Sequence, residues 1–127
     1  MFELTIIVDF EAAHFIQDYP GKCSRLHGHN WKVEVAVSGS KLNELGMLID
    51  FHDLKAEVKQ VIETLDHRYL NEIEPFNVCN PTAENIAKYI YEQLVNRPAF
   101  VDVAVRVLSV KVWESAHSAV TYSEVAR

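Results

Sequence analysis

The sequence predicts an α+β domain in which an antiparallel sheet carries two helices on one face. Near both ends of the chain, apolar and polar residues alternate, as they do in half-buried strands. In the middle of the chain, apolar residues recur at helical spacing instead. The element order is therefore ββααββ, and burial of a single strand face favours an antiparallel sheet covered on one side.

Four segments show the alternation of a strand. They cover residues 2–15, 31–37, 101–114 and 119–125. Between the first two, residues 17–28 contain Pro20 and two glycines, which indicates a loop. A sheet of four strands exposes its edges, and self-association is one way to cover them.

Two helices are expected between the strand pairs. The first begins at Asp50, a typical N-cap residue, and its apolar positions recur as far as Leu65. The second begins at Thr82 and ends before Pro98. Its apolar face consists of Ala83, Ile86, Ile90 and Leu94.

Composition limits the classes of function. The 127 residues are expected to form one domain, residues 1–127, and the net charge of −6 argues against a general nucleic-acid or anionic-membrane surface. No apolar run approaches the roughly 18 residues of a membrane helix. The chain starts with a strand pattern and not a signal peptide, and it has only two cysteines, so we expect a cytoplasmic protein.

Three histidines share the parity of the buried rows. His14 continues the apolar row of the first strand, whereas His27 and His29 precede that of the second. Side chains at i and i+2 of an extended chain point to the same face. Because the end of one strand meets the start of the other in an antiparallel pair, we expect the three imidazoles to converge.

Three neutral imidazoles suit Zn²⁺ and leave its fourth position open, which is typical of a catalytic site. Copper or another first-row metal is an alternative, and so are ordinary core or loop histidines. Cys23, four residues before His27, would close the site as a fourth ligand or act as a thiolate beside the metal. The spacing leaves both roles open. Cys79 is expected to be a small buried residue.

Two further positions are candidates. Asp66 and His67 are expected to close the first helix, where the histidine either stabilises the helix end or acts as a base tuned by the carboxylate. In the third strand the buried parity shifts near Ser109, so Glu114 falls in the buried row. An inward carboxylate needs partners, and two parallel N–H donors of a ligand would supply them. Alternatively, the strand ends at Trp113 and Glu114 faces water.

Six motifs in this order resemble the 6-pyruvoyltetrahydropterin synthase family, which includes the bacterial 6-carboxytetrahydropterin synthases of queuosine-precursor synthesis. They lie at residues 10–14, 23–29, 46–51, 65–67, 81–85 and 112–114. The resemblance implies the tunnelling fold (T-fold), in which ββααββ units join into a barrel of three subunits and two trimers stack into a homohexamer.

The resemblance also implies roles for individual residues. Zinc would be held by His14, His27 and His29. Cys23 would be a proton acceptor and not a ligand, and Asp66 and His67 would complete its relay, serving a neighbouring subunit's zinc. Glu114 would anchor the pterin, with Thr82 nearby. The candidates for binding triphosphate are Lys22, Arg25 and Arg68.

The implied substrate is 7,8-dihydroneopterin triphosphate, and no organic cofactor is needed. The short chain favours the bacterial carboxy type, which releases acetaldehyde and triphosphate, over the pyruvoyl type, which only eliminates triphosphate. A non-catalytic zinc- or pterin-binding protein is the third alternative. Residues 115–118 lack the threonine that follows the glutamate in many relatives, and we expect His117 to be a turn residue.

Overall fold

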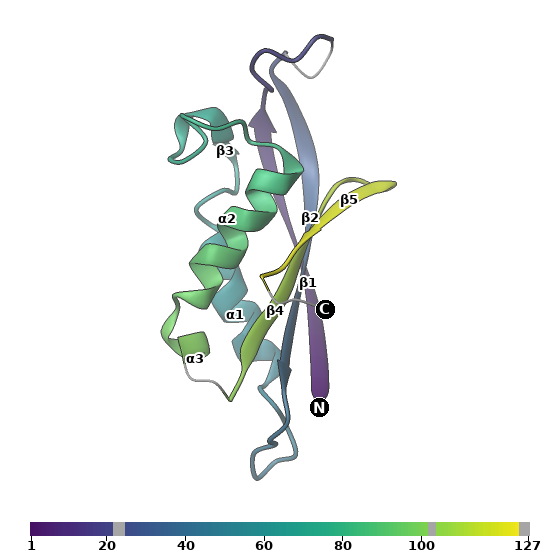
Figure 1. The fold of residues 1–127 in the computed structure, drawn as a ribbon, viewed down its shortest axis with the longest axis vertical. Coiled ribbons are helices and arrows are strands. Elements are labelled where there is room, and N and C mark those ends of the chain that lie inside the picture. The colour runs from purple at the N-terminus through teal and green to yellow at the C-terminus, as the bar shows by residue number, and fades with distance from the viewer. Residues whose placement is uncertain (22–24, 102–103, 125–127) are drawn as a thin grey trace.

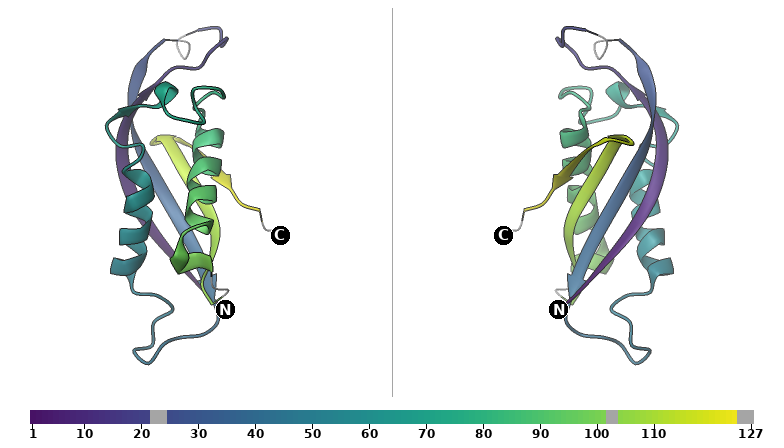
Figure 2. Two further views of the ribbon diagram at one scale, coloured as in Figure 1. Left: turned by 90° about the vertical axis from the view of Figure 1, so that its left-hand side faces the viewer. Right: turned by 90° about the vertical axis from the view of Figure 1, so that its right-hand side faces the viewer.

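A computed structural model describes residues 1–21, 25–101 and 104–124. Its described part contains a five-stranded sheet with the strand order β3-β1-β2-β4-β5. The elements are β1 (Phe2–His14), β2 (His27–Gly39), α1 (Phe51–Ile62), β3 (Arg68–Tyr69), the 3-10 helix η2 (Leu70–Glu72), α2 (Ala83–Val95), α3 (Pro98–Val101), β4 (Arg106–Ser115) and β5 (Ser118–Tyr122). Helices α1 and α2 lie side by side on one face of the sheet (Figures 1 and 2), as the alternation in the sequence predicts.

The long hairpin of β1 and β2 determines where the ends of these strands lie. The two strands are antiparallel in continuous register, from Phe2 opposite Gly39 to His14 opposite His27. Burial alternates along β1, so one face packs against the helices and the other faces outward. The end of β1 therefore meets the start of β2 at one edge of the sheet.

A β-bulge explains the shift of parity in β4. Ser109 lies opposite Ala36, but the next pair joins Val107 to Val37, so Leu108 is an extra residue. Beyond the bulge, Val110 and Val112 are fully buried. The predicted shift of the buried row near Ser109 is confirmed.

Several predicted boundaries are wrong. The third long strand begins at Arg106 and not at residue 101, because residues 98–101 form the short helix α3. Helix α1 ends at Ile62, so Asp66 and His67 follow it in a turn and do not close it. The two-residue strand β3, which runs parallel to β1, was not expected at all.

Both predicted N-caps are present. The Asp50 carboxylate accepts a hydrogen bond from the backbone N–H of His52 at 2.7 Å, and the Thr82 hydroxyl accepts one from that of Asn85 at 3.1 Å. The apolar faces that follow pack into the core, where each fully buried leucine or isoleucine contributes roughly 1.5–3 kcal/mol. Thr82 therefore fixes the start of α2, and with it the adjoining Pro81.

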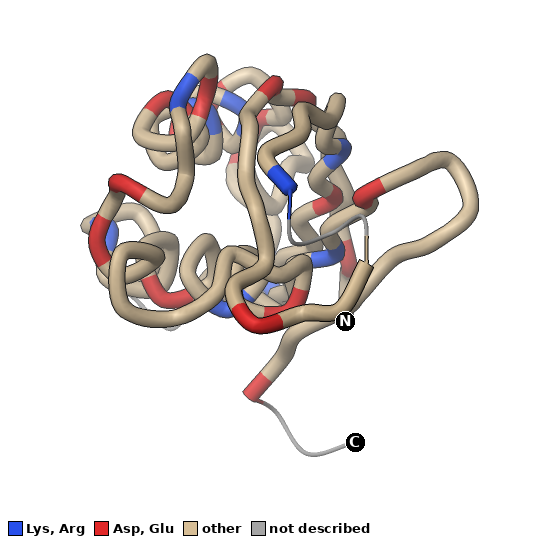
Figure 3. Tube along the Cα trace, turned by 90° about the horizontal axis from the view of Figure 1, so that it is seen from above, with Lys and Arg blue, Asp and Glu red and all other residues tan. Residues whose placement is uncertain are grey.

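Charged residues of both signs are intermixed along the described chain (Figure 3). Neither this distribution nor the net charge of −6 indicates a broad basic face on the described chain. Across the described ranges, no helix is long and apolar enough to cross a membrane.

Candidate functional site

The three predicted histidines converge at one edge of the sheet. His14 ends β1 and is only 1% exposed, His27 is its direct partner at the start of β2, and His29 lies opposite Ala12. One ring nitrogen of each histidine lies within 4.8 Å of the others. The convergence predicted from parity is confirmed.

Backbone carbonyls orient two of the rings. The Nδ1 atom of His14 lies 2.7 Å from the carbonyl oxygen of Pro81, and Nδ1 of His27 lies 2.6 Å from that of Arg25. A carbonyl only accepts, so each Nδ1 must carry the hydrogen, and in a neutral ring Nε2 then carries a lone pair. The second nitrogen of both rings is thereby prepared to bind a cation.

The Nε2 atoms of His14 and His27 are 3.0 Å apart. Two lone pairs at that distance repel each other unless a proton or a metal ion lies between them. Nitrogen ligands of a tetrahedral metal with bonds of about 2.0–2.1 Å are separated by roughly 3.3 Å, close to the distance found. Burial lowers the pKa of His14, which disfavours a proton and leaves the ring in the form that binds metal.

His29 supplies the third nitrogen. Its Nε2 atom is buried and makes no hydrogen bond within the described residues. Leaving a buried polar atom unpaired costs roughly 1–3 kcal/mol, and a metal ion would remove that cost. Burial lowers the pKa of His29 as well, although the nearby Glu114 carboxylate raises it in part. The three donors therefore fit a divalent cation held by neutral imidazoles.

Trp31 forms an apolar floor beneath the histidines. It is fully buried, and its ring centroid lies 5.0 Å from that of His14 and 5.3 Å from that of His29. Its Nε1 atom donates to the carbonyl of Ala12 at 3.4 Å. An apolar wall of this kind keeps water away from the inner side of the site and restricts rotation of the rings.

Glu114 and Thr82 lie beside the histidines. Strand β4 continues to Ser115, so the alternative that it ends at Trp113 is wrong. The Glu114 carboxylate is half-buried and lies 3.6 Å from Nε2 of His29. Thr82 directly follows Pro81, the residue whose carbonyl contacts His14. The structure thus brings both residues to the same edge as the metal site.

Asp66 and His67 form a separate cluster with Glu11. One Asp66 carboxylate oxygen accepts the backbone N–H of Glu11 at 3.0 Å and lies 2.9 Å from Nδ1 of His67. The other ring nitrogen of His67 is 3.3 Å from the Glu11 carboxylate. The backbone hydrogen bond from Glu11 is the largest cause that lowers the pKa of Asp66, and the bond with His67 lowers it further.

His67 itself has an unusual backbone. Its φ angle is +57°, which is uncommon for a residue other than glycine, and its N–H donates to the carbonyl of Glu11 at 2.6 Å. Strain of this kind is often found at functional sites. The contact with Glu11 joins residues far apart in the sequence, and no sequence pattern indicated it.

Within one chain, this cluster does not join the metal site. Alternation along β1 places Glu11 and His14 on opposite faces of the sheet. In the part of the chain that the structure describes, no hydrogen bond or ion pair links the side chain of Asp66 or His67 to the three histidines; their partners are Glu11 and each other. A shallow hollow lined by Glu11, His67 and Arg68 also reaches His29 at the sheet edge.

The other predicted positions have mixed outcomes. Lys22 and Cys23 lie outside the described residues, so the role of Cys23 stays a prediction. Arg25 is exposed and contributes its carbonyl to the site. His117 lies in the turn between β4 and β5, as predicted.

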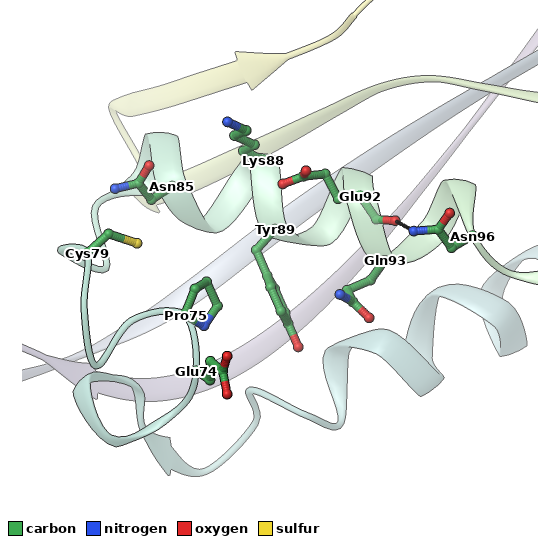
Figure 4. A pocket seen from close by; sticks show the side chains of 9 residues that line it. All are labelled: Glu74, Pro75, Cys79, Asn85, Lys88, Tyr89, Glu92, Gln93 and Asn96. Carbon is green, nitrogen blue, oxygen red and sulfur yellow. Dashed lines mark hydrogen bonds between the residues drawn. The ribbon is translucent and has the colours of Figure 1, made fainter.

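The prediction that Cys79 is buried is wrong, because its loop leaves it exposed. It lines a second hollow between α2 and the segment that precedes it (Figure 4). None of the predicted site residues lines this hollow.

The overall fold is shared with solved 6-pyruvoyl tetrahydropterin synthases. The structure resembles that of 6-pyruvoyl tetrahydropterin synthase from Caenorhabditis elegans with a TM-score of 0.81 and 28% identity, over 98% of this chain and 96% of that one. It also resembles the synthase from Plasmodium vivax with a TM-score of 0.69 and 25% identity, over 96% and 98% of the two chains. These are T-fold proteins, and the predicted T-fold of a single subunit is confirmed.

Sequence comparison agrees with the fold. Residues 3–125 match the family described as 6-pyruvoyl tetrahydropterin synthase. The 6-carboxy-5,6,7,8-tetrahydropterin synthase of Haemophilus influenzae is 32% identical over 98% of this chain and all of its own length. That of Bacillus subtilis is 39% identical over 83% and 78% of the two chains. The chain belongs to the 6-pyruvoyl tetrahydropterin synthase family.

Proposed function

We propose that this protein is a zinc-dependent 6-carboxy-5,6,7,8-tetrahydropterin synthase, a lyase acting on 7,8-dihydroneopterin triphosphate. The observation that carries the proposal is the convergence of three imidazoles, two with Nε2 prepared by carbonyl contacts and one with a buried Nε2 that lacks a hydrogen bond. The relatives named as carboxy enzymes support this choice of product.

His14, His27 and His29 would hold the zinc ion. When bound, the ion would polarise hydroxyl oxygens of the substrate side chain and make the neighbouring C–H and O–H groups more acidic. Glu114, 3.6 Å from His29, would accept the paired N–H donors of the pterin and fix the ring beside the metal. Thr82, at the start of α2, would form part of the wall of the same pocket.

Protons would be moved by Cys23, Asp66 and His67. Asp66 contacts Nδ1 of His67 and holds the ring so that Nε2 faces outward, toward Glu11. Since Glu11 and His14 lie on opposite sheet faces, His67 would serve the zinc site of a neighbouring subunit. A homohexamer built from two trimeric barrels would provide such sites between subunits and cover the sheet edges. Lys22, Arg25 and Arg68 are the proposed contacts to triphosphate.

Product analysis of the purified zinc-loaded protein tests this function. Incubation with 7,8-dihydroneopterin triphosphate is expected to release acetaldehyde, triphosphate and 6-carboxytetrahydropterin. Formation of 6-pyruvoyltetrahydropterin without acetaldehyde would support the alternative synthase. Binding of the pterin without turnover would instead indicate a non-catalytic binding protein.

A further inference from the structure

Two asparagine side chains continue the sheet beyond the end of β1. The backbone partner of β1 on this side, β3, pairs only with Ala12 and Ala13. Beyond these two residues, the side chains of Asn71 and Asn80 form hydrogen bonds with the backbone of Phe15 and Gln17, in place of a neighbouring strand. We call Asn71 and Asn80 the asparagine clamp.

Each member of the asparagine clamp makes two hydrogen bonds with a single residue. The Asn71 side-chain oxygen accepts the N–H of Phe15 at 3.0 Å, and its amide group donates to the carbonyl of Phe15 at 3.1 Å. Asn80 bonds in the same way to Gln17, at 2.9 and 3.2 Å. A carboxamide has the same donor and acceptor as a peptide group, so it can replace one residue of a neighbouring strand.

Asn80 also directly precedes Pro81, the residue whose carbonyl contacts the ring of His14. The carbonyl of Asn80 accepts the side-chain amide of Asn85 at 2.8 Å, and the next carbonyl, that of Pro81, lies 2.7 Å from Nδ1 of His14. Asn80 therefore links the backbone three residues after His14 to the carbonyl that orients the His14 ring.

We infer that the asparagine clamp positions His14 for metal binding. This inference rests on the proposed metal site, because it assigns the orientation of one ligand. His14 is the last residue of β1, and Phe15 and Gln17 follow it with their N–H and C=O groups on the side of the asparagine clamp. Without these four bonds, no described residue pairs with the chain beyond Ala13 on this side. Only the ladder with β2 would then hold His14, and the alignment of its ring with the Pro81 carbonyl would loosen.

The substitutions Asn80→Asp and Asn71→Asp test the inference with little change in size. Each keeps an acceptor for the backbone N–H, loses the donor and places a charged oxygen beside a carbonyl. Losing a residue that orients a metal ligand weakens metal affinity by about 10–100-fold, so we expect about 10-fold for each variant and about 100-fold for both together. Affinity for Zn²⁺ or Co²⁺ is measured by competition with a chelator on the full-length protein.

Asn96→Asp is the matched control. Asn96 donates a side-chain hydrogen bond to the carbonyl of Glu92 at 2.9 Å, at the far end of α2 (Figure 4). This substitution changes the same chemical group but leaves the metal site intact, so affinity should equal that of the wild type. Circular dichroism confirms that each variant is folded, and if Asn80→Asp does not fold, Asn71→Asp carries the same test.

Hydrogen exchange provides a readout that does not depend on metal. The amides of Phe15 and Gln17 should exchange faster in Asn71→Ala and Asn80→Ala respectively. If these alanine variants show faster exchange but bind the metal with wild-type affinity, the positioning role is overturned. A wild-type protein that binds no divalent metal would overturn it as well. Metal affinity that falls as expected in a protein that makes no pterin product would overturn the proposed function and leave the asparagine clamp standing.

Discussion

His14 and His27 are direct partners in the β1–β2 ladder, and their Nε2 atoms lie 3.0 Å apart. Their other ring nitrogens are both engaged by carbonyls, so neither ring can turn away without losing a hydrogen bond. The fold therefore holds two lone pairs in a repulsive arrangement that a cation relieves. Binding of that cation should add to the stability of the folded protein.

We expect His27→Ala to lose the metal. Removing one of three donors and one half of the 3.0 Å pair leaves too few ligands for stable binding. Metal content, measured by mass spectrometry after gel filtration, should fall from one ion per chain to less than about a tenth. His52→Ala, at an exposed position of α1, should keep the full content.

The same pair of variants tests stability. At a free zinc concentration about 100 times the dissociation constant, the wild type should gain about 2.7 kcal/mol in free energy of unfolding. His52→Ala should gain as much, and His27→Ala should gain nothing. Equal zinc stabilisation of all three proteins would contradict the three-histidine site.

Glu114→Gln should keep the metal but lower kcat/KM. The substitution preserves the size of the side chain beside His29 but removes the charge that would accept two N–H donors of the pterin. Losing one charge-assisted hydrogen bond costs roughly 1.5–3 kcal/mol, so kcat/KM should fall about 10–100-fold. Steady-state kinetics measure the loss, and Glu124→Gln is the control. A variant of Glu114 with normal kcat/KM would exclude the anchoring role.

Cys23→Ala separates the two roles that the spacing leaves open. If the thiolate moves a proton, the variant keeps one metal ion per chain and its turnover falls by about 10²-fold or more. If the thiolate is a fourth ligand, metal content and turnover fall together. Cys79→Ala controls for loss of a thiol, because Cys79 is exposed in a hollow that none of the three histidines lines. Loss of zinc from the Cys23 variant would contradict the proposed mechanism.

The sequence was sufficient to predict the parts of the site that depend on alternation. Parity along the two paired strands predicts that His14, His27 and His29 converge, and the parity shift near Ser109 predicts that Glu114 lies in the buried row of its strand, whereas its position beside His29 comes from the structure. Periodicity carries this information because a strand exposes every second residue to the same face.

Contacts without periodicity could not be predicted. The two-residue strand β3 is too short to show a pattern and forms where residues 68–69 meet β1. The contact of His67 with Glu11 and the hydrogen bonds of Asn71 and Asn80 join segments more than 50 residues apart. Such contacts depend on how α1 and the following turn return to β1.

Asp66 makes stability depend on pH. The backbone N–H of Glu11, and secondarily His67, lower the pKa of Asp66 below its usual value of 3.8. A lowered pKa in the folded state stabilises the protein fully above the unfolded value, and this contribution is lost as pH falls through the folded value. Because the Asp66 side chain is 36% exposed and water screens its charge, Asp66→Ala should lower the free energy of unfolding at pH 7 by less than about 1 kcal/mol.

The metal-free protein is used for this measurement, so that loss of the ion does not contribute. Urea unfolding at pH 7 and at pH 3 should show the difference between wild type and Asp66→Ala shrinking as pH falls below 3.8. Asp66→Asn, which keeps an acceptor for the Glu11 N–H, should show a smaller loss at pH 7. An equal difference at both pH values would contradict the role of the carboxylate charge.

Gly39 ends β2 in a space that admits no side chain. A Cβ atom there would lie 2.5 Å from the carbonyl oxygen of Ala104 and 2.5 Å from Cδ1 of Leu48. The leucine tip can move, but the carbonyl belongs to the backbone that leads into β4. Gly39→Ala should therefore force this backbone apart and lower the free energy of unfolding by roughly 1–3 kcal/mol.

Gly28→Ala is the matched control, because Gly28 lies in the same strand and a Cβ there would meet nothing within 4 Å. In urea, Gly39→Ala should shift the unfolding midpoint downward at constant slope, whereas Gly28→Ala should leave it unchanged or raise it slightly. Since Gly39 pairs with Phe2, at the opposite end of the hairpin from His14 and His27, metal affinity of Gly39→Ala should stay normal. Weakened metal binding in this variant would show that strain passes along the whole β1–β2 hairpin to the histidines.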